Sequence, residues 1–234
     1  MTDKRKYYEK AGVVSRYDGW RFGSAGGRYV DSEESDAVLA AVEPLPRHAR
    51  VLDLPVGTGR LTERLQAVGF ERVFCADASA PMLASARARC GPRPVLSRHD
   101  AFMLGFKDAS FDGVICLRFL FHYHRLSGVL SEIARILKPG GVAVFDTLRW
   151  SPRAVLPYAQ VPFGGLVYPR RDSSVEAAIV EAGLRCVSYS RILLLPSLAY
   201  RFLPRRGIEL VRRLEKTMPE RCRTKTIWTA MRCA

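Results

Sequence analysis

Short apolar runs alternate with stretches of helical periodicity through the middle of the chain. The apolar runs predict five strands, over residues 50–54, 72–76, 94–97, 113–117 and 142–146. The periodic stretches predict helices over residues 60–68, 80–88 and 126–137. Strands and helices that alternate at this spacing indicate βαβ units, a largely parallel sheet and right-handed crossovers.

The pattern is looser at both ends of the chain. Residues 1–30 form a polar, aromatic-rich lead-in that is helical in part and ends in the glycine-rich run 23–27, and a helix is expected over 33–42. Past residue 147 a loop rich in Pro, Gly and Tyr is expected to run to Tyr168, followed by a helix over 173–182 and two more strands over 185–195 and 224–231. The segment 196–219 between these strands is too long for a hairpin and predicts a helical insertion.

The expected fold class is therefore α/β, with a Rossmann-like doubly wound sheet of seven mostly parallel strands. The last strand is expected to be antiparallel, and helices are expected on both faces. A length of 234 residues fits a single domain, 1–234. Within it we expect an N-terminal helical cap (1–45), a ligand-binding core (46–147) and a C-terminal part (148–234) that contains the insertion.

Composition narrows the class of protein. There is no signal-like apolar run and no stretch of eighteen apolar residues, so a cytoplasmic protein is expected. The six cysteines are scattered, without spacing typical of zinc ligands, and predict reduced thiols and no metal site.

The formal charge of +14 is concentrated near the C-terminus. From Arg185 onward, twelve Lys or Arg stand against three Glu. Such a basic face suggests an anionic partner: nucleic acid, an acidic lipid surface or a phosphorylated substrate. A solvated, arginine-rich surface without any partner is the alternative.

The first predicted strand leads into a glycine turn and then a helix, in the segment VLDLPVGTGRL (51–61). Backbone N–H groups at the start of that helix can face a ligand with no Cβ in the way, which is typical of nucleotide-cofactor sites. A dinucleotide fingerprint requires G-x-G-x-x-G, whereas this chain has Pro55, Gly57 and Arg60 at the three positions. The segment therefore argues against NAD.

The same segment closely resembles motif I of the class I S-adenosylmethionine (SAM) dependent methyltransferases, with Pro55 at the first glycine position. Four later segments are similar to further motifs of that family, in order and at the right spacing: 77–83 (DASAPML), 100–112, 114–123 and 132–141. The resemblance covers residues 50–147 and is of the small-molecule, quinone-biosynthesis type. It implies SAM as the cofactor, bound in the core 46–147.

Asp77, twenty residues beyond Gly57, is expected to accept hydrogen bonds from the ribose hydroxyls. By the resemblance, Met82 would pack near the adenine and Asp100 would accept a hydrogen bond from its amino group; for Met82, ordinary core packing is the alternative. The complete set of expected cofactor contacts is Tyr17, Arg21, Asp53, Pro55, Gly57, Gly59, Asp77, Ala78, Met82, Asp100, Ala101 and Leu117.

Two of these contacts lie in the lead-in, where Tyr17, Asp18 and Arg21 form a Y-D-x-x-R pattern. Arg21 is expected to meet the methionine carboxylate and Tyr17 to cap the pocket. A plain surface helix is the alternative.

Methyl transfer requires a general base only if the acceptor is protonated at neutral pH. His122 is the first candidate for that role because it follows the fourth strand, and His124 is the second. For His122, a purely structural hydrogen bond is the alternative.

The acceptor is narrowed by what the loop after the fourth strand lacks. It has no Asn/Asp-Pro-Pro-aromatic motif, which argues against methylation of the amino groups of nucleic-acid bases. It also has no Pro-Cys nucleophile, which argues against methylation of cytosine C5, and no glutamate pair, which argues against methylation of protein arginine. A small hydrophobic or lipid-linked acceptor remains.

The predicted insertion, 196–219, suggests what kind of partner the protein binds. In it Ile208, Val211, Leu214 and Met218 recur every three or four residues, edged by basic residues. This stripe suggests peripheral contact with an anionic membrane, or a lid over an amphiphilic substrate, or a helix packed on its own sheet. An RNA-associated protein that uses the basic C-terminal face is the alternative function.

Overall fold

The computed structural model describes residues 7–155 and 166–233, and its described strands form one seven-stranded sheet. The strands are β1 (Arg50–Asp53), β2 (Arg72–Asp77), β3 (Val95–Arg98), β4 (Phe111–Cys116), β5 (Leu137–Leu148), β6 (Leu184–Ile192) and β7 (Lys225–Arg232). Their order across the sheet is β3-β2-β1-β4-β5-β7-β6, and only β7 runs antiparallel to its neighbours. The predicted fold class is confirmed, including the reversed last strand.

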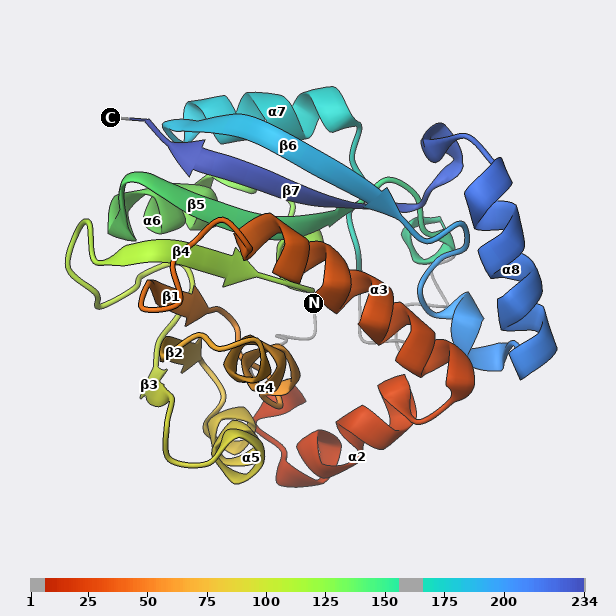
Figure 1. Cartoon of the computed structure of the whole chain (residues 1–234), viewed down its shortest axis with the longest axis horizontal. Coiled ribbons are helices and arrows are strands. Elements are labelled where there is room, and N and C mark those ends of the chain that lie inside the picture. Colours follow the sequence, from red (N-terminus) through yellow and green to blue (C-terminus); the bar gives the residue numbers. More distant parts are fainter. Residues whose placement is uncertain (1–6, 156–165, 234) are drawn as a thin grey trace.

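The helices cover both faces of this sheet (Figure 1). They are α2 (Ala11–Phe22), α3 (Ala25–Val42), α4 (Arg60–Ala67), α5 (Ala80–Cys90), α6 (Ser127–Ile136), α7 (Asp172–Glu181) and α8 (Arg205–Thr217). Because side chains alternate along a strand, Val51 of β1 faces the core beneath α3, α4 and α5, whereas Leu52 faces the core beneath α6 and α7. Helices α3 to α8 each bury apolar residues against one of these two cores, whereas α2 packs on α3 and α5.

The chain order reverses beside β1, which pairs with β2 on one side and with β4 on the other. In a doubly wound sheet the connections leave the carboxyl ends of such strands in opposite directions, so a crevice opens between them. This topology places the ends of β1, β2 and β4 around one site.

The N-terminal region differs from the sequence prediction, because α3 begins at Ala25 and not at residue 33, and includes Gly26 and Gly27. Glycine is a poor helix former, so local propensity placed these two residues in a connecting run. In the structure they let backbones approach closely: a Cβ at Gly26 would overlap the carbonyl oxygen of Tyr200, and one at Gly27 would lie 2.5 Å from the carbonyl oxygen of Arg21. The glycines therefore serve helix packing here.

Two features of the C-terminal half also differ from the prediction. The expected turn at 138–141 lies within the bounds of β5, which begins at Leu137 and pairs there with Phe111 before the register shifts. The sixth strand ends at Ile192, short of the expected residue 195, because Leu193 adopts a positive φ of 61°. Residues 156–165 of the predicted Pro, Gly and Tyr-rich loop lie outside the described residues.

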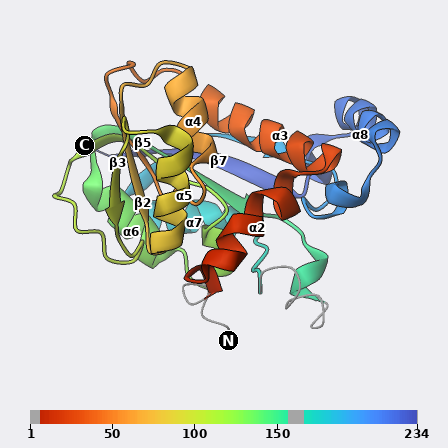
Figure 2. The ribbon, with the colours of Figure 1, turned by 90° about the horizontal axis from the view of Figure 1, so that it is seen from below.

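The predicted helical insertion is present, as a short 3-10 turn (Ala199–Phe202) followed by α8. Figures 1 and 2 both show α8 at the end of α3, beyond the rim of the sheet. No helix among the described residues is long and apolar enough to cross a membrane.

Candidate functional site

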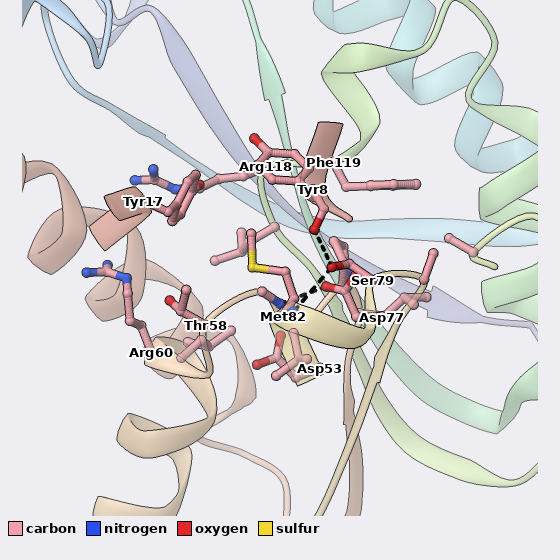
Figure 3. Close-up of a pocket in the computed structure, with 18 of the residues that line it drawn as sticks. Tyr8, Tyr17, Asp53, Thr58, Arg60, Asp77, Ser79, Met82, Arg118 and Phe119 are labelled. Carbon is pink, nitrogen blue, oxygen red and sulfur yellow. Dashed lines mark hydrogen bonds between the residues drawn. The ribbon is translucent and has the colours of Figure 1, made fainter. Parts of the chain in front are cut away.

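A pocket of about 170 Å³ opens at the carboxyl ends of β1, β2 and β4. Figure 3 shows that Asp53 lies below Met82 in this pocket, whereas Tyr17 and Arg118 lie above it. The floor therefore comes from the sheet and its turns, and the cover from α2 and from the loop after β4.

The glycine turn after β1 forms one wall. Gly57 has a φ of +55°, and a Cβ added there would meet no protein atom within 4 Å. Because Gly57 lines the pocket, that missing Cβ leaves space which a ligand can fill.

Asp77 stands at the end of β2, beside the glycine turn, and is buried. Its carboxylate accepts the N–H of Gly57 and the N–H of Ser79, each at 2.9 Å. Burial raises the pKa of Asp77, although these backbone N–H donors oppose the shift. A carboxylate has about four acceptor positions, so Asp77 keeps acceptor capacity for a hydroxyl group of a ligand.

Asp53 ends β1 and is only 2% exposed. Its carboxylate accepts a hydrogen bond from the hydroxyl of Thr62, at 2.7 Å. Burial raises the pKa of Asp53 to about 7; the hydrogen bond from Thr62 opposes the rise and the charge of Asp77 adds to it. The pocket floor therefore contains a carboxyl group that titrates near neutral pH.

Helix α2 and the residues before it cover the pocket. Asp18 accepts a hydrogen bond from the hydroxyl of Thr58 in the glycine turn, at 2.8 Å. The carbonyl of Tyr8 accepts the hydroxyl of Ser79 at 2.7 Å, and the ring of Tyr8 meets that of Tyr17 edge to face. Figure 2 shows α2 lying beside α5, as these contacts require. The cap is thus joined to both turns that form the floor.

Sequence reasoning missed a cluster of charges at the inner end of the pocket. Arg118 donates its Nε–H to Glu34 at 2.6 Å, and Lys225 lies 2.7 Å from the other oxygen of Glu34 and 2.5 Å from Asp146. These residues come from α3, β5, β7 and the loop after β4, and Lys225 is only 2% exposed. No sequence spacing relates them, because Glu34 and Lys225 are 191 positions apart.

Two arginines enclose the ring of Phe22 at the pocket edge. The guanidinium carbon of Arg118 lies 4.4 Å from the ring centroid and that of Arg60 lies 3.2 Å from it. Arg60 also pairs with Asp31, and burial together with the charge of Arg118 lowers its pKa to about 9. Both guanidinium groups therefore lie against one aromatic ring, and each is also paired with a carboxylate of α3.

The loop after β4 supplies the remaining wall, from Leu117 to Tyr123. His122 faces the pocket, and its Nδ1 lies 3.1 Å from the carbonyl oxygen of Leu166. A carbonyl oxygen only accepts, so Nδ1 bears the proton and Nε2 is the basic nitrogen of the neutral ring. Phe119 and Tyr123 of the same loop pack on each other, with ring centroids 4.7 Å apart, and also line the pocket.

Most of the residues expected from the sequence meet in this one pocket. Those that line it are Tyr17, Asp53, Pro55, Gly57, Asp77, Ala78, Met82, Asp100, Ala101, Leu117 and His122. Their roles toward a cofactor or acceptor stay predictions.

Three expected residues are placed elsewhere. A Cβ at Gly59 would lie 2.8 Å from the Sγ of Cys90, so Gly59 serves the packing of α4 on α5. Arg21 is not among the lining residues, and burial and the charge of Arg118 lower its pKa. His124 lies against the ring of Tyr168, outside the pocket lining.

A doubly wound sheet with a reversed last strand, a glycine turn after β1 and an acidic residue ending β2 define a class I methyltransferase fold. Residues 52–145 match the methyltransferase domain family. The chain therefore contains a class I methyltransferase domain, as the motifs predicted.

Two of the similar sequences are demethylmenaquinone methyltransferases. The protein of Beutenbergia cavernae is 40% identical over 108 residues, which cover 44% of this chain and 43% of that protein. The protein of Thermus thermophilus is 37% identical over 139 residues, which cover 56% of this chain and 57% of that protein. The chain thus spans about half the length of these relatives.

Solved structures share the fold at low sequence identity. The magnesium protoporphyrin IX methyltransferase of Synechocystis PCC 6803, solved with bound S-adenosylhomocysteine (SAH), is 20% identical, with a TM-score of 0.68 over 97% of each chain. The phosphoethanolamine N-methyltransferase 2 of Haemonchus contortus, solved with SAM, is 18% identical, with a TM-score of 0.72 over 100% of this chain and 61% of that one.

Proposed function

We propose that this chain is a SAM-dependent methyltransferase that methylates a small, hydrophobic or lipid-linked acceptor. The observation behind the proposal is the Asp77 carboxylate, which is held by the N–H groups of Gly57 and Ser79 and faces the pocket with acceptor capacity to spare. Adjacent ribose hydroxyls match that capacity. The match to the methyltransferase domain family supports the same conclusion.

The remaining wall residues fit the other parts of SAM. The space over Gly57 accommodates the cofactor close to the backbone, and Met82 offers an apolar surface to the adenine. Asp100 and Ala101 line the same pocket. The edge formed by Arg60 and Arg118 suits a carboxylate such as that of the methionine part.

When bound, SAM supplies a methyl group on a sulfonium that is already activated for transfer. The protein then has to hold the acceptor in line and keep water out. The cap of Tyr8 and Tyr17 excludes water, since its contacts with Ser79 and the neighbouring rings hold it over the floor. For a hydroxyl acceptor, Nε2 of His122 takes the proton.

The aromatic side chains of the loop after β4 support a planar, apolar acceptor. Phe119 and Tyr123 offer flat apolar surfaces, and Tyr17 and Phe22 of α2 add two more rings to the pocket lining. Planar apolar molecules stack favourably on such rings. The demethylmenaquinone relatives support a quinol-like acceptor.

Calorimetric titration with SAH tests the cofactor assignment. We expect Asp77→Asn to weaken binding about 100-fold, since two charge-assisted hydrogen bonds contribute roughly 3 kcal/mol together. Asp112→Asn is the matched control, because Asp112 also accepts a backbone N–H, from Arg50 at 2.8 Å, but lies outside the pocket lining. Affinity in Asp77→Asn within twofold of the unmodified protein would refute the ribose assignment.

Methyl transfer to a short-chain prenylated naphthoquinol tests the acceptor and the base. We expect His122→Asn, which keeps a donor for the carbonyl of Leu166, to lower the turnover rate about 100-fold while SAH affinity is unchanged. The activity that remains should lose the pH dependence caused by the imidazole. Full turnover in His122→Asn would exclude the base, and tight SAH binding without any transfer to quinols would exclude this acceptor class alone.

A further inference from the structure

The inner face of α8 is fixed to the body of the protein. Ile208 and Val211 are buried in the core shared with α3. Glu215, on the same side, accepts hydrogen bonds from the hydroxyl of Tyr200 at 2.6 Å and from the N–H of Leu194 at 2.8 Å. Half of the predicted apolar stripe is therefore ordinary core.

The outer face of α8 presents apolar side chains to solvent. Leu210 is 58% exposed and Leu214, one turn further on, is 41% exposed. Arg206 and Arg213 are also exposed, and at 3.6 residues per turn all four lie within an arc of about 100°. These two leucines and two arginines are called the outer strip of α8.

Residues next to the outer strip are also exposed and apolar, or basic. Phe202, just before the helix, and Met218, just after it, are exposed as well. Between residues 199 and 223 eight Lys or Arg stand against three Glu. Figures 1 and 2 place α8 at the margin of the molecule, and among the described residues no other helix or strand lies outside it.

We propose that the outer strip of α8 binds the surface of an anionic lipid bilayer. Leucines of an interfacial helix enter the boundary between headgroups and acyl chains, while neighbouring arginines meet lipid phosphates. RNA binding would use the arginines alone and leave Leu210 and Leu214 in water, so the mixed strip favours lipid. This inference is independent of the proposed function, because it involves no residue of the pocket.

Sedimentation with vesicles tests the charge requirement. The protein should partition onto mixed phosphatidylcholine–phosphatidylglycerol vesicles more strongly than onto pure phosphatidylcholine. Arg206→Glu/Arg213→Glu should lower the partition coefficient about 25-fold or more, since each basic residue near an anionic surface accounts for roughly fivefold. Arg72→Glu/Arg93→Glu is the matched control, with the same change in charge at exposed positions near the opposite end of the sheet.

A second pair of variants tests the leucines. Leu210→Gln/Leu214→Gln should lower binding about tenfold. Val180→Gln/Val187→Gln, at positions exposed on α7 and β6, should leave it unchanged. Circular dichroism and thermal melting establish that each variant is folded.

The proposal is overturned if both α8 variants bind mixed vesicles as the unmodified protein does. It is also overturned if the protein prefers single-stranded RNA, with a steep dependence on salt and no effect of the leucine changes. Selective loss in both α8 variants, with both controls unaffected, supports it.

Discussion

Asp53→Asn removes an ionisable group from the end of β1 and keeps its shape. The native carboxyl is buried, and its pKa is raised to about 7, from an ordinary value of 3.8. Thr62 can donate to the asparagine oxygen as it does to Asp53, so the hydrogen bond at 2.7 Å is retained. The substitution therefore isolates the cost of ionising this side chain in the folded protein.

The sign of the effect follows from which state binds the proton more tightly. Because the pKa is higher in the folded state, the folded protein holds more protons between about pH 4 and pH 7, and its free energy of unfolding falls as pH rises. The shift of about 3 units corresponds to a loss of about 4 kcal/mol over the whole range, of which roughly 2.5 kcal/mol falls between about pH 5 and pH 8. Asp53→Asn should lack this loss.

Urea denaturation of the cofactor-free protein at several pH values measures the difference. We expect Asp53→Asn to be more stable than the unmodified protein at pH 8 and to approach it at acidic pH. Asp112→Asn should show the opposite dependence of stability on pH. Hydrogen bonds from Lys138 and Arg50 outweigh burial and lower the pKa of Asp112 in the folded protein. This variant should therefore lose stability only above the pKa of the unfolded state. Parallel stability curves for Asp53→Asn and the unmodified protein would refute the reasoning.

Two pairs of glycine substitutions test the pocket and the packing. Gly57→Ala and Gly140→Ala both place a Cβ at positive φ and should each lower the free energy of unfolding by about 1 to 2 kcal/mol. Only Gly57→Ala should also weaken SAH binding in calorimetry, because Gly140 lies outside the pocket lining. Equal SAH affinity in the two variants would show that no ligand occupies the space over Gly57. Gly26→Ala should lower the melting temperature strongly, because its Cβ would overlap the backbone of Tyr200. Gly12→Ala, in the first turn of α2 where a Cβ would meet no atom, should raise it slightly. A Gly26→Ala protein as stable as the original would mean that α3 and the turn at Tyr200 are not packed as described.

The central part of the fold was predictable because each element depends on nearby residues. The alternation of apolar runs and amphipathic helices specified β1 to β5 and α4 to α6 to within a few residues, with the exception of the early start of β5. The glycine turn and Asp77 were equally readable, since the position of each along its strand sets where it lies on the sheet. The predicted start of α3 was wrong, because the packing that makes Gly26 favourable in this helix involves Tyr200, which is distant in the sequence.

The candidate site was predictable only in part, because some of its residues meet only through contacts between distant segments. The floor residues follow motifs that are contiguous in the chain, whereas the cluster of Glu34, Arg118 and Lys225 joins three distant segments. Arg21 and Gly59 belong to recognisable patterns, but neither is among the lining residues, and Gly59 serves the packing of α4 on α5.

The sequence by itself determined the doubly wound class, the glycine turn and the acids at the ends of β1 and β2, because strand alternation and turn chemistry are local properties. Only the tertiary structure decided which residues share a pocket and which face of α8 remains in solvent. Those outcomes depend on contacts between segments far apart in the chain, such as α3 with α8, for which local propensity contains no information.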